Sequence, residues 1–263
     1  MERHHSETIE NLVTLHKKEP SVIALILGGS IAHGFAQPSS DVDVCIVVND
    51  DDFARRKAES KLVYNNRDPK IVVYDGGYVD GKYANKAFLS LVAEKGSDAI
   101  RYSFKDNVVL FSHDPQLEEL LQRIVRFPIE KKSERLERFV AQVLAWKWYY
   151  SEAVKKQNQY LLYLATQKIV LFSGRIVLTA NHMLYPYHKW LLAELAKAER
   201  TPENFLTDVQ TLLHNPSEEF VTEFCRRVLD FAGYDEKSYF WPDRFMRDSE
   251  QNWMSHEAPV DDL

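Results

Sequence analysis

Short apolar segments alternate with longer polar stretches through the first half of the chain. Val22–Leu27 and Val42–Val48 are apolar almost throughout and rich in branched side chains, which predicts two buried strands. Ser6–Lys18 places its apolar residues on one helical face, and Lys86–Lys95 is also expected to be helical. Strands that alternate with helices in this way predict an α/β unit.

Further strands and helices are expected in the same unit. The stretch NDDDFARRKAESKLVYNN is expected to be a helix capped by Asn49 or Asp50, because acidic residues in its first turn suit the helix dipole. The remaining expected elements are the helix Leu117–Arg126 and the strand candidates Ile71–Tyr74, Tyr78–Tyr83 and Val108–Phe111.

The pattern changes near RFPIEKKSERLERF, where Pro128 interrupts the helical spacing and a new helix is expected from about Ile129. Tyr160–Ala180 is apolar on nearly all sides, which is typical of the central helix of a bundle. We therefore expect two domains. Residues 1–128 should form an α/β (α+β) domain with a mixed sheet flanked by helices, and residues 129–263 an all-α helical bundle.

Composition narrows the classes of function. The formal net charge is −6, and no cluster of basic residues suggests a surface for long nucleic acids, although a short tRNA end would be compatible. No apolar run reaches the length of a membrane span, and MERHHSETIE does not resemble a signal peptide. Cys45 and Cys225 are far apart, so neither a disulfide framework nor a zinc site is indicated. A reducing, cytoplasmic location is expected.

The stretch GGSIAHGFAQPSSDVDV, between the two apolar strands, combines two chemical signals. Gly28 and Gly29 allow a sharp turn and a close approach to a ligand, and Ser30 opens a short helix whose free N–H groups can bind phosphate. Asp41 and Asp43 lie on the same side of the following strand, where two carboxylates would repel each other without a cation. Mg²⁺ prefers such ligands together with substrate phosphates. The combination predicts phosphoryl or nucleotidyl transfer.

This stretch resembles the GS-x(10–12)-DxD signature of the DNA-polymerase-β-like nucleotidyltransferase superfamily, and the two-domain layout resembles its antibiotic (aminoglycoside and lincosamide) nucleotidyltransferase branch. The resemblance implies a third carboxylate on a neighbouring strand. Asp80 is the preferred candidate and Asp75 the second, although both lie in turn-like sequences. The third acid would either complete a second metal site or deprotonate the acceptor hydroxyl.

The implied activity is Mg²⁺-dependent transfer of a nucleoside monophosphate from a nucleoside triphosphate, with ATP the expected donor, to a hydroxyl of a small molecule. Gly28, Gly29 and Ser30 would bind the phosphates, and the three aspartates would hold the metal. Two alternatives stay open, namely nucleotidylation of a protein and a non-catalytic nucleotide sensor. No membrane partner is expected.

The second half carries weaker signals. By analogy with two-domain relatives, Lys189 is a candidate to close on the triphosphate, and Tyr185, Tyr187 and His188 could line an acceptor pocket, although aromatic residues at this spacing more often belong to a core. Arg175 and His182 loosely match the R-x(4–6)-H ribonuclease pattern of HEPN domains, a pairing that is common by accident.

Two residues of the first half, Arg101 and His33, carry similarly weak signals. Arg101 is expected to form a surface ion pair rather than a phosphate contact. His33 lies near the phosphate turn and is expected to pack or to face water.

Overall fold

The computed structural model describes residues 1–214, 216–255 and 257, and the chain divides into two compact units, Met1–Arg126 and Phe127–Leu263. The boundary expected from the sequence lies after residue 128. Each unit has its own hydrophobic core.

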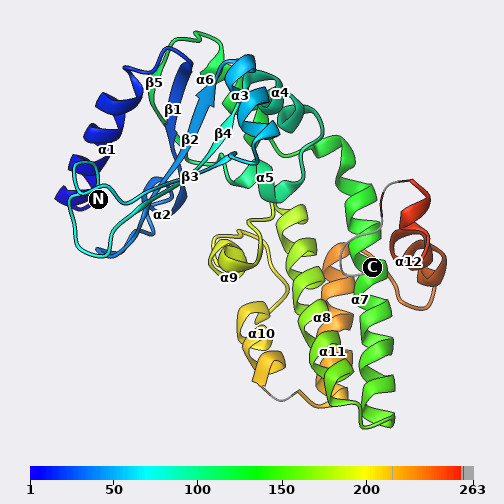
Figure 1. Ribbon diagram of the computed structural model, residues 1–263. Helices are drawn as coiled ribbons and strands as arrows, with labels where there is room; N and C mark the ends of the chain where they lie inside the picture. Colours follow the sequence, from blue (N-terminus) through cyan, green and yellow to red (C-terminus); the bar gives the residue numbers. More distant parts are fainter. Residues whose placement is uncertain (215, 256, 258–263) are drawn as a thin grey trace. The chain divides into compact units, whose positions relative to one another are not determined.

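The N-terminal unit is built on a five-stranded sheet with the order β3-β4-β2-β1-β5 (Figure 1). Strands β2 and β4 are parallel, and the other three neighbouring pairs are antiparallel, so the sheet is mixed as expected. The strands are β1 (Val22–Leu27), β2 (Val42–Val48), β3 (Val63–Asn66), β4 (Val79–Ala84) and β5 (Val108–Ser112).

Helices cover both faces of this sheet, as the alternation of residues along β2 requires. Val42, Val44 and Ile46 pack in a core with residues of α1, whereas Cys45 and Val47 pack on the other face in a core with residues of α4 and α6. The helices of the unit are α1 (Arg3–His16), α2 (Gly29–Ala32), α3 (Asp50–Ala58), α4 (Lys86–Lys95), α5 (Asp98–Tyr102) and α6 (Leu117–Val125).

Two expectations for this unit were wrong. Ile71–Tyr74 is not a strand, because the backbone N–H of Ile71 donates to the Asp68 carbonyl at 2.8 Å and closes a turn. The segment VYNN belongs to β3 and not to the preceding helix. That helix, α3, ends at Ala58, and Ser60 follows with φ 56°, a left-handed conformation that turns the chain toward the sheet.

Four connections of the sheet meet at one edge. β1 ends at Leu27, which pairs with Val44 near the start of β2, and Val42 pairs with Val79 at the start of β4. Asn66, the last residue of β3, also pairs with Val79. The residues after β1, before β2, before β4 and after β3 therefore lie side by side along this edge.

The C-terminal unit is helical, as expected. Its α-helices are α7 (Lys132–Lys155), α8 (Gln159–Ala180), α9 (Leu191–Leu195), α10 (Phe205–His214), α11 (Glu218–Ala232) and α12 (Trp241–Ser249), with 3-10 turns η1 (Ile129–Lys131), η2 (His188–Trp190) and η3 (Asn252–Met254).

Helix α8 contributes to the core of this unit together with residues of α7, α10 and α11. Among the described residues, α8 is the one helix long and apolar enough to cross a membrane, so the expectation that no apolar run reaches that length was wrong by this measure. Half of its apolar window is buried inside the structure, as for a core helix.

Candidate active site

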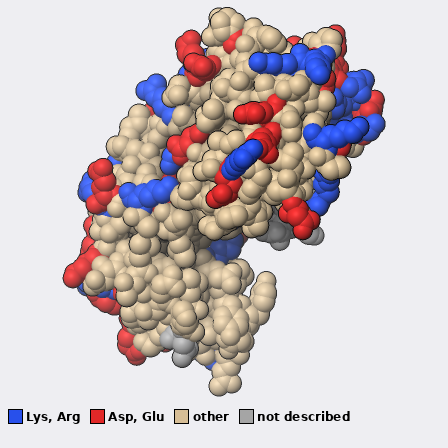
Figure 2. All heavy atoms as spheres, turned by 90° about the vertical axis from the view of Figure 1, so that its left-hand side faces the viewer, with Lys and Arg blue, Asp and Glu red and all other residues tan. Residues whose placement is uncertain are grey.

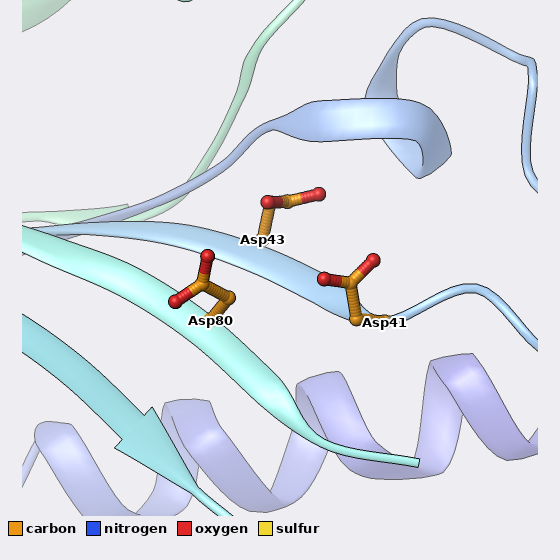
Figure 3. A group of neighbouring side chains, drawn as sticks. All are labelled: Asp41, Asp43 and Asp80. Carbon is orange, nitrogen blue, oxygen red and sulfur yellow. The ribbon is translucent and has the colours of Figure 1, made fainter. Parts of the chain in front are cut away.

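Three carboxylates lie together at the shared edge of the sheet. Asp41 and Asp43 come from the start of β2, and Asp80 comes from β4, where it is the register partner of Asp43 (Figure 3). One oxygen from each side chain lies within 4.8 Å of the other two. Neighbouring strands in register direct paired side chains to the same face, which explains why the third acid joins the pair.

The position of the acids at the start of the strand keeps them accessible. They alternate along β2 with Val42 and Val44, which are buried on the opposite face. Cys45 lies farther along the acid face and is buried in the core, where desolvation raises the pKa of its thiol to about 11. The carboxylates therefore lie at the accessible end of this face of the sheet, and the rest of the face is buried in the core.

The turn after β1 runs directly against Asp43. The Gly28 N–H donates to the Asp43 carbonyl at 2.9 Å, and Gly29 adopts φ 62° at the start of α2. A Cβ atom on Gly29 would lie 1.7 Å from Asp43 Oδ2, so only glycine fits here. The glycine pair thus brings a helix start, with its unsatisfied N–H groups, next to the acids.

The far side of α2 is held by the segment that follows α5. His33 Nδ1 lies 3.2 Å from Asp106 Oδ2, and the His33 ring stacks on Tyr102 with centroids 5.1 Å apart. His33 therefore packs against Tyr102, which is one of the two alternatives expected from the sequence. The Asn107 amide approaches within 3.3 Å of the position that a Gly28 Cβ would occupy. These contacts fix the glycine turn from behind.

Tyr78 lies against the acids from the β4 side. Its backbone carbonyl accepts from the Val42 N–H at 3.1 Å. Hydrogen bonding to Asp41, together with the charges of Asp41, Asp80 and Asp43, raises the pKa of the Tyr78 hydroxyl. Tyr78 was expected only as a strand residue, although its position two residues before Asp80 was a usable signal.

The carbonyl of Ser40, immediately before Asp41, is held by two aromatic side chains. Tyr74 Oη donates to it at 2.7 Å, and His5 Nε2 lies 3.0 Å from it. The His5 ring is fully buried beside Tyr74, and burial lowers its pKa. No sequence pattern predicted this clamp, the pair of contacts from Tyr74 and His5 that fixes the backbone immediately before Asp41.

Replacing Tyr74 by phenylalanine is expected to loosen this clamp while the ring stays in place. One net hydrogen bond contributes about 1 kcal/mol, so the free energy of unfolding should fall by roughly that amount. Mn²⁺ binding to the aspartates should also weaken, because Asp41 follows the released carbonyl. Urea unfolding and the electron paramagnetic resonance signal of Mn²⁺ measure the two effects.

Tyr64→Phe provides the matched control. The Tyr64 hydroxyl accepts from Asn66 Nδ2 at 2.9 Å, away from the Ser40 carbonyl. This variant should lose comparable stability and keep the Mn²⁺ affinity of the parent. Equal Mn²⁺ affinities in all three proteins would rule out the clamp as a positioning device.

Asp75, the second candidate for the third carboxylate, is exposed in a turn and outside the group of three acids. The expectation for Arg101 was wrong. The side chain is buried and donates to the carbonyls of Ala93, Gly96 and Ile124 at 2.8–3.2 Å, so it binds the C-terminal ends of α4 and α6 inside the unit and does not lie at the surface.

The candidate binding residues of the helical unit lie in different local environments. Lys189 lies in η2 with its ammonium 5.1 Å from the Trp190 ring centroid, and its part in nucleotide binding stays a prediction. Tyr185 is buried in the helical core, whereas Tyr187 is 59% exposed. His188 Nδ1 lies 3.2 Å from the Tyr185 hydroxyl.

The ribonuclease-like pair is also placed in this unit. The Arg175 guanidinium lies 4.5 Å from the ring centroids of Phe139 and Tyr185, and His182 Nε2 lies 2.8 Å from Lys132 Nζ. Each side chain thus has its own structural neighbours, which is an ordinary packing arrangement.

A mixed sheet with a glycine turn after its first strand and carboxylates on two neighbouring strands defines a class of enzyme that transfers nucleotidyl groups. Residues 6–87 match the family model described as a nucleotidyltransferase domain, a segment that contains the turn and all three aspartates. Residues 6–87 therefore form a nucleotidyltransferase domain, and the match supports a transferase enzyme.

One solved structure extends the likeness to the helical unit. A nucleotidyltransferase-like protein from Exiguobacterium sibiricum 255-15 is 11% identical in sequence, with a TM-score of 0.50 over 94% of this chain and 80% of that chain. At this identity the likeness concerns the fold alone. No curated protein matches the chain in sequence.

Proposed function

We propose that the protein transfers a nucleoside monophosphate from a nucleoside triphosphate, with ATP the expected donor, to a hydroxyl group of a small molecule. The observation that carries the proposal is the group of Asp41, Asp43 and Asp80 beside the Gly28–Ser30 turn. A phosphate-binding turn and a cation-binding set of acids are the two parts that this chemistry requires.

The three carboxylates suit a divalent cation. Their oxygens are hard ligands, they approach one another within 4.8 Å, and Mg²⁺ commonly combines protein carboxylates with substrate phosphates. When bound there, Mg²⁺ would supply charge stabilisation to the phosphate oxygens during an in-line displacement. The aspartates would hold it and would themselves be relieved of mutual repulsion.

The remaining parts follow from the chain itself. The Gly28–Ser30 turn would bind the phosphates that leave, because the N–H groups of Gly29 and Ser30 lie in the first turn of α2. The acceptor oxygen forms a bond to the α-phosphorus, the bond to pyrophosphate breaks, and the hydroxyl proton is released to Asp80 as general base or to solvent. In-line displacement places the attacking and the leaving oxygen on opposite sides of the phosphorus.

Surface charge is compatible with a small acceptor. On the face drawn in Figure 2, basic and acidic side chains are intermingled and form no continuous basic area. Long nucleic acids normally require such an area. The preference for a small acceptor belongs to the proposal on these grounds. The resemblance to the antibiotic nucleotidyltransferase branch and a cytoplasmic location enter it from the sequence alone.

The test is to incubate the protein with Mg²⁺ and each labelled nucleoside triphosphate in the presence of acceptor pools. Mass spectrometry should find a small molecule heavier by one nucleoside monophosphate, with pyrophosphate released in parallel. A labelled protein in place of a small molecule would favour protein nucleotidylation. Nucleotide binding without any pyrophosphate release would leave only the sensor.

A further inference from the structure

The edge of the sheet that carries the aspartates continues beyond them to a basic residue. In sheet order from β1 to β3, the positions along this edge are Gly28, Asp41, Tyr78 and Arg67. Gly28 and Arg67 thus lie on opposite sides of the acids. The family resemblance and the sequence patterns assigned no role to Arg67.

Arg67 is held by an aromatic ring and by no acid. Its guanidinium carbon lies 4.7 Å from the centroid of the Tyr78 ring, and the side chain is exposed. Within the part of the chain that the structure describes, no carboxylate forms an ion pair with it. The adjacent Asp68 uses Oδ1 to accept from the Lys70 N–H at 2.9 Å, which shapes the loop.

An arginine on an aromatic ring is well prepared to bind an anion. The ring restricts the guanidinium without consuming its N–H donors, and the planar fork of donors matches two oxygens of a phosphate or carboxylate. Tyr78 itself is fixed at its backbone, where its carbonyl accepts from the Val42 N–H at 3.1 Å. Tyr78 therefore lies between Arg67 and Asp41 along this edge of the sheet.

The geometry of transfer then decides which substrate reaches Arg67. If the leaving phosphates bind at the Gly28–Ser30 turn on the β1 side, in-line attack brings the acceptor from the other side of the acids. That side is formed by β4 and the end of β3, where Tyr78 and Arg67 lie. A divalent cation would offset two of the three aspartate charges, and Arg67, which forms no ion pair with a described carboxylate, would be a cationic group on the acceptor side.

We propose that Arg67, supported by the Tyr78 ring, selects acceptors that carry a phosphate or carboxylate group near the reactive hydroxyl. The inference rests on the proposed nucleotidyl transfer and narrows its acceptor class. Polycationic acceptors, such as aminoglycosides, would place positive charge against the guanidinium and would be disfavoured.

The experiment offers the protein ATP, Mg²⁺ and three acceptor pools: sugar phosphates with hydroxy acids, the matching neutral sugars, and aminoglycosides. Nucleotidylated products should arise from the anionic pool. For the best acceptor of that pool, Arg67→Ala should raise the acceptor KM about tenfold, as expected for one charge-assisted contact. The ATP KM and kcat should stay unchanged, because the contact is made equally before and during reaction.

Two further variants separate recognition from folding. Arg67→Lys keeps the charge without the fork and should give an intermediate acceptor KM. Lys57→Ala removes one exposed positive charge from α3 and should change neither KM. Thermal unfolding should be the same for all variants, because Arg67 is exposed.

The possible failures are distinguishable. If no pool yields a nucleotidylated product, the proposed function is wrong, and this inference falls with it. If products come only from neutral sugars or aminoglycosides, the transferase proposal stands and the role of Arg67 is wrong. An unchanged acceptor KM in Arg67→Ala would also overturn that role.

Discussion

Replacing Asp43 by asparagine is expected to lower the rate of nucleotidyl transfer about a thousandfold while the protein stays folded. Asparagine has nearly the same shape but lacks the negative charge, so the acidic group would hold a divalent cation poorly. Removing one of three neighbouring like charges also relieves repulsion. Without metal, the free energy of unfolding should therefore be no lower than in the parent protein.

Pyrophosphate release and urea unfolding measure these two effects. Asp75→Asn is the matched control, because the substitution also removes one negative charge. Asp75 is exposed in a turn outside the group of three acids. The variant should keep the parental rate. Undiminished Mg²⁺-dependent release in Asp43→Asn would remove the acidic group from the reaction.

The elements nearest the site could be predicted because local and tertiary preferences agree there. Val22–Leu27 and Val42–Val48 are strands with the expected bounds, since branched apolar residues favour both strand conformation and burial. The strand expected at Ile71–Tyr74 failed for the opposite reason. Its apolar residues are held in a turned segment, and Val72 is buried in the same core as residues of α1.

The acids of the site were accessible to sequence reasoning, whereas their supports were not. Asp41 and Asp43 share a short motif, and Asp80 came from the family resemblance. His5 reaches the Ser40 carbonyl from 35 residues away, and Tyr74 reaches it from 34 residues away. Neither contact has a local pattern, because pairing across such separations depends on how the loops fold over the sheet edge.

Arg101 shows a second kind of limit. An arginine in a polar segment was expected at the surface, and exposure is the usual state of this residue type. In the structure it donates to backbone carbonyls at two helix ends, which carry no side-chain signature in the sequence. Charged residues that bind backbone groups are therefore difficult to recognise before the fold is known.

Replacing Gly29 by alanine is expected to reduce transfer at least about a hundredfold and to lower the free energy of unfolding by roughly 1–3 kcal/mol. The new Cβ would lie 1.7 Å from Asp43 Oδ2 and 2.6 Å from Asp43 Cβ. Rotation of the carboxylate cannot relieve the second contact, so the turn and the strand must move apart. The glycine turn and the three aspartates would be displaced together.

Gly34→Ala separates this collision from the backbone effect. Gly34 also has a left-handed backbone, with φ 77°, but a Cβ there would meet nothing within 4 Å. This variant should lose about 1 kcal/mol of stability from its backbone conformation and keep most of its activity. Pyrophosphate release and urea unfolding, measured on both variants, compare the two sites directly. If both variants lose activity equally, the contact between Gly29 and Asp43 does not organise the site. If only Gly29→Ala is inactive, the turn and the acids act as one unit.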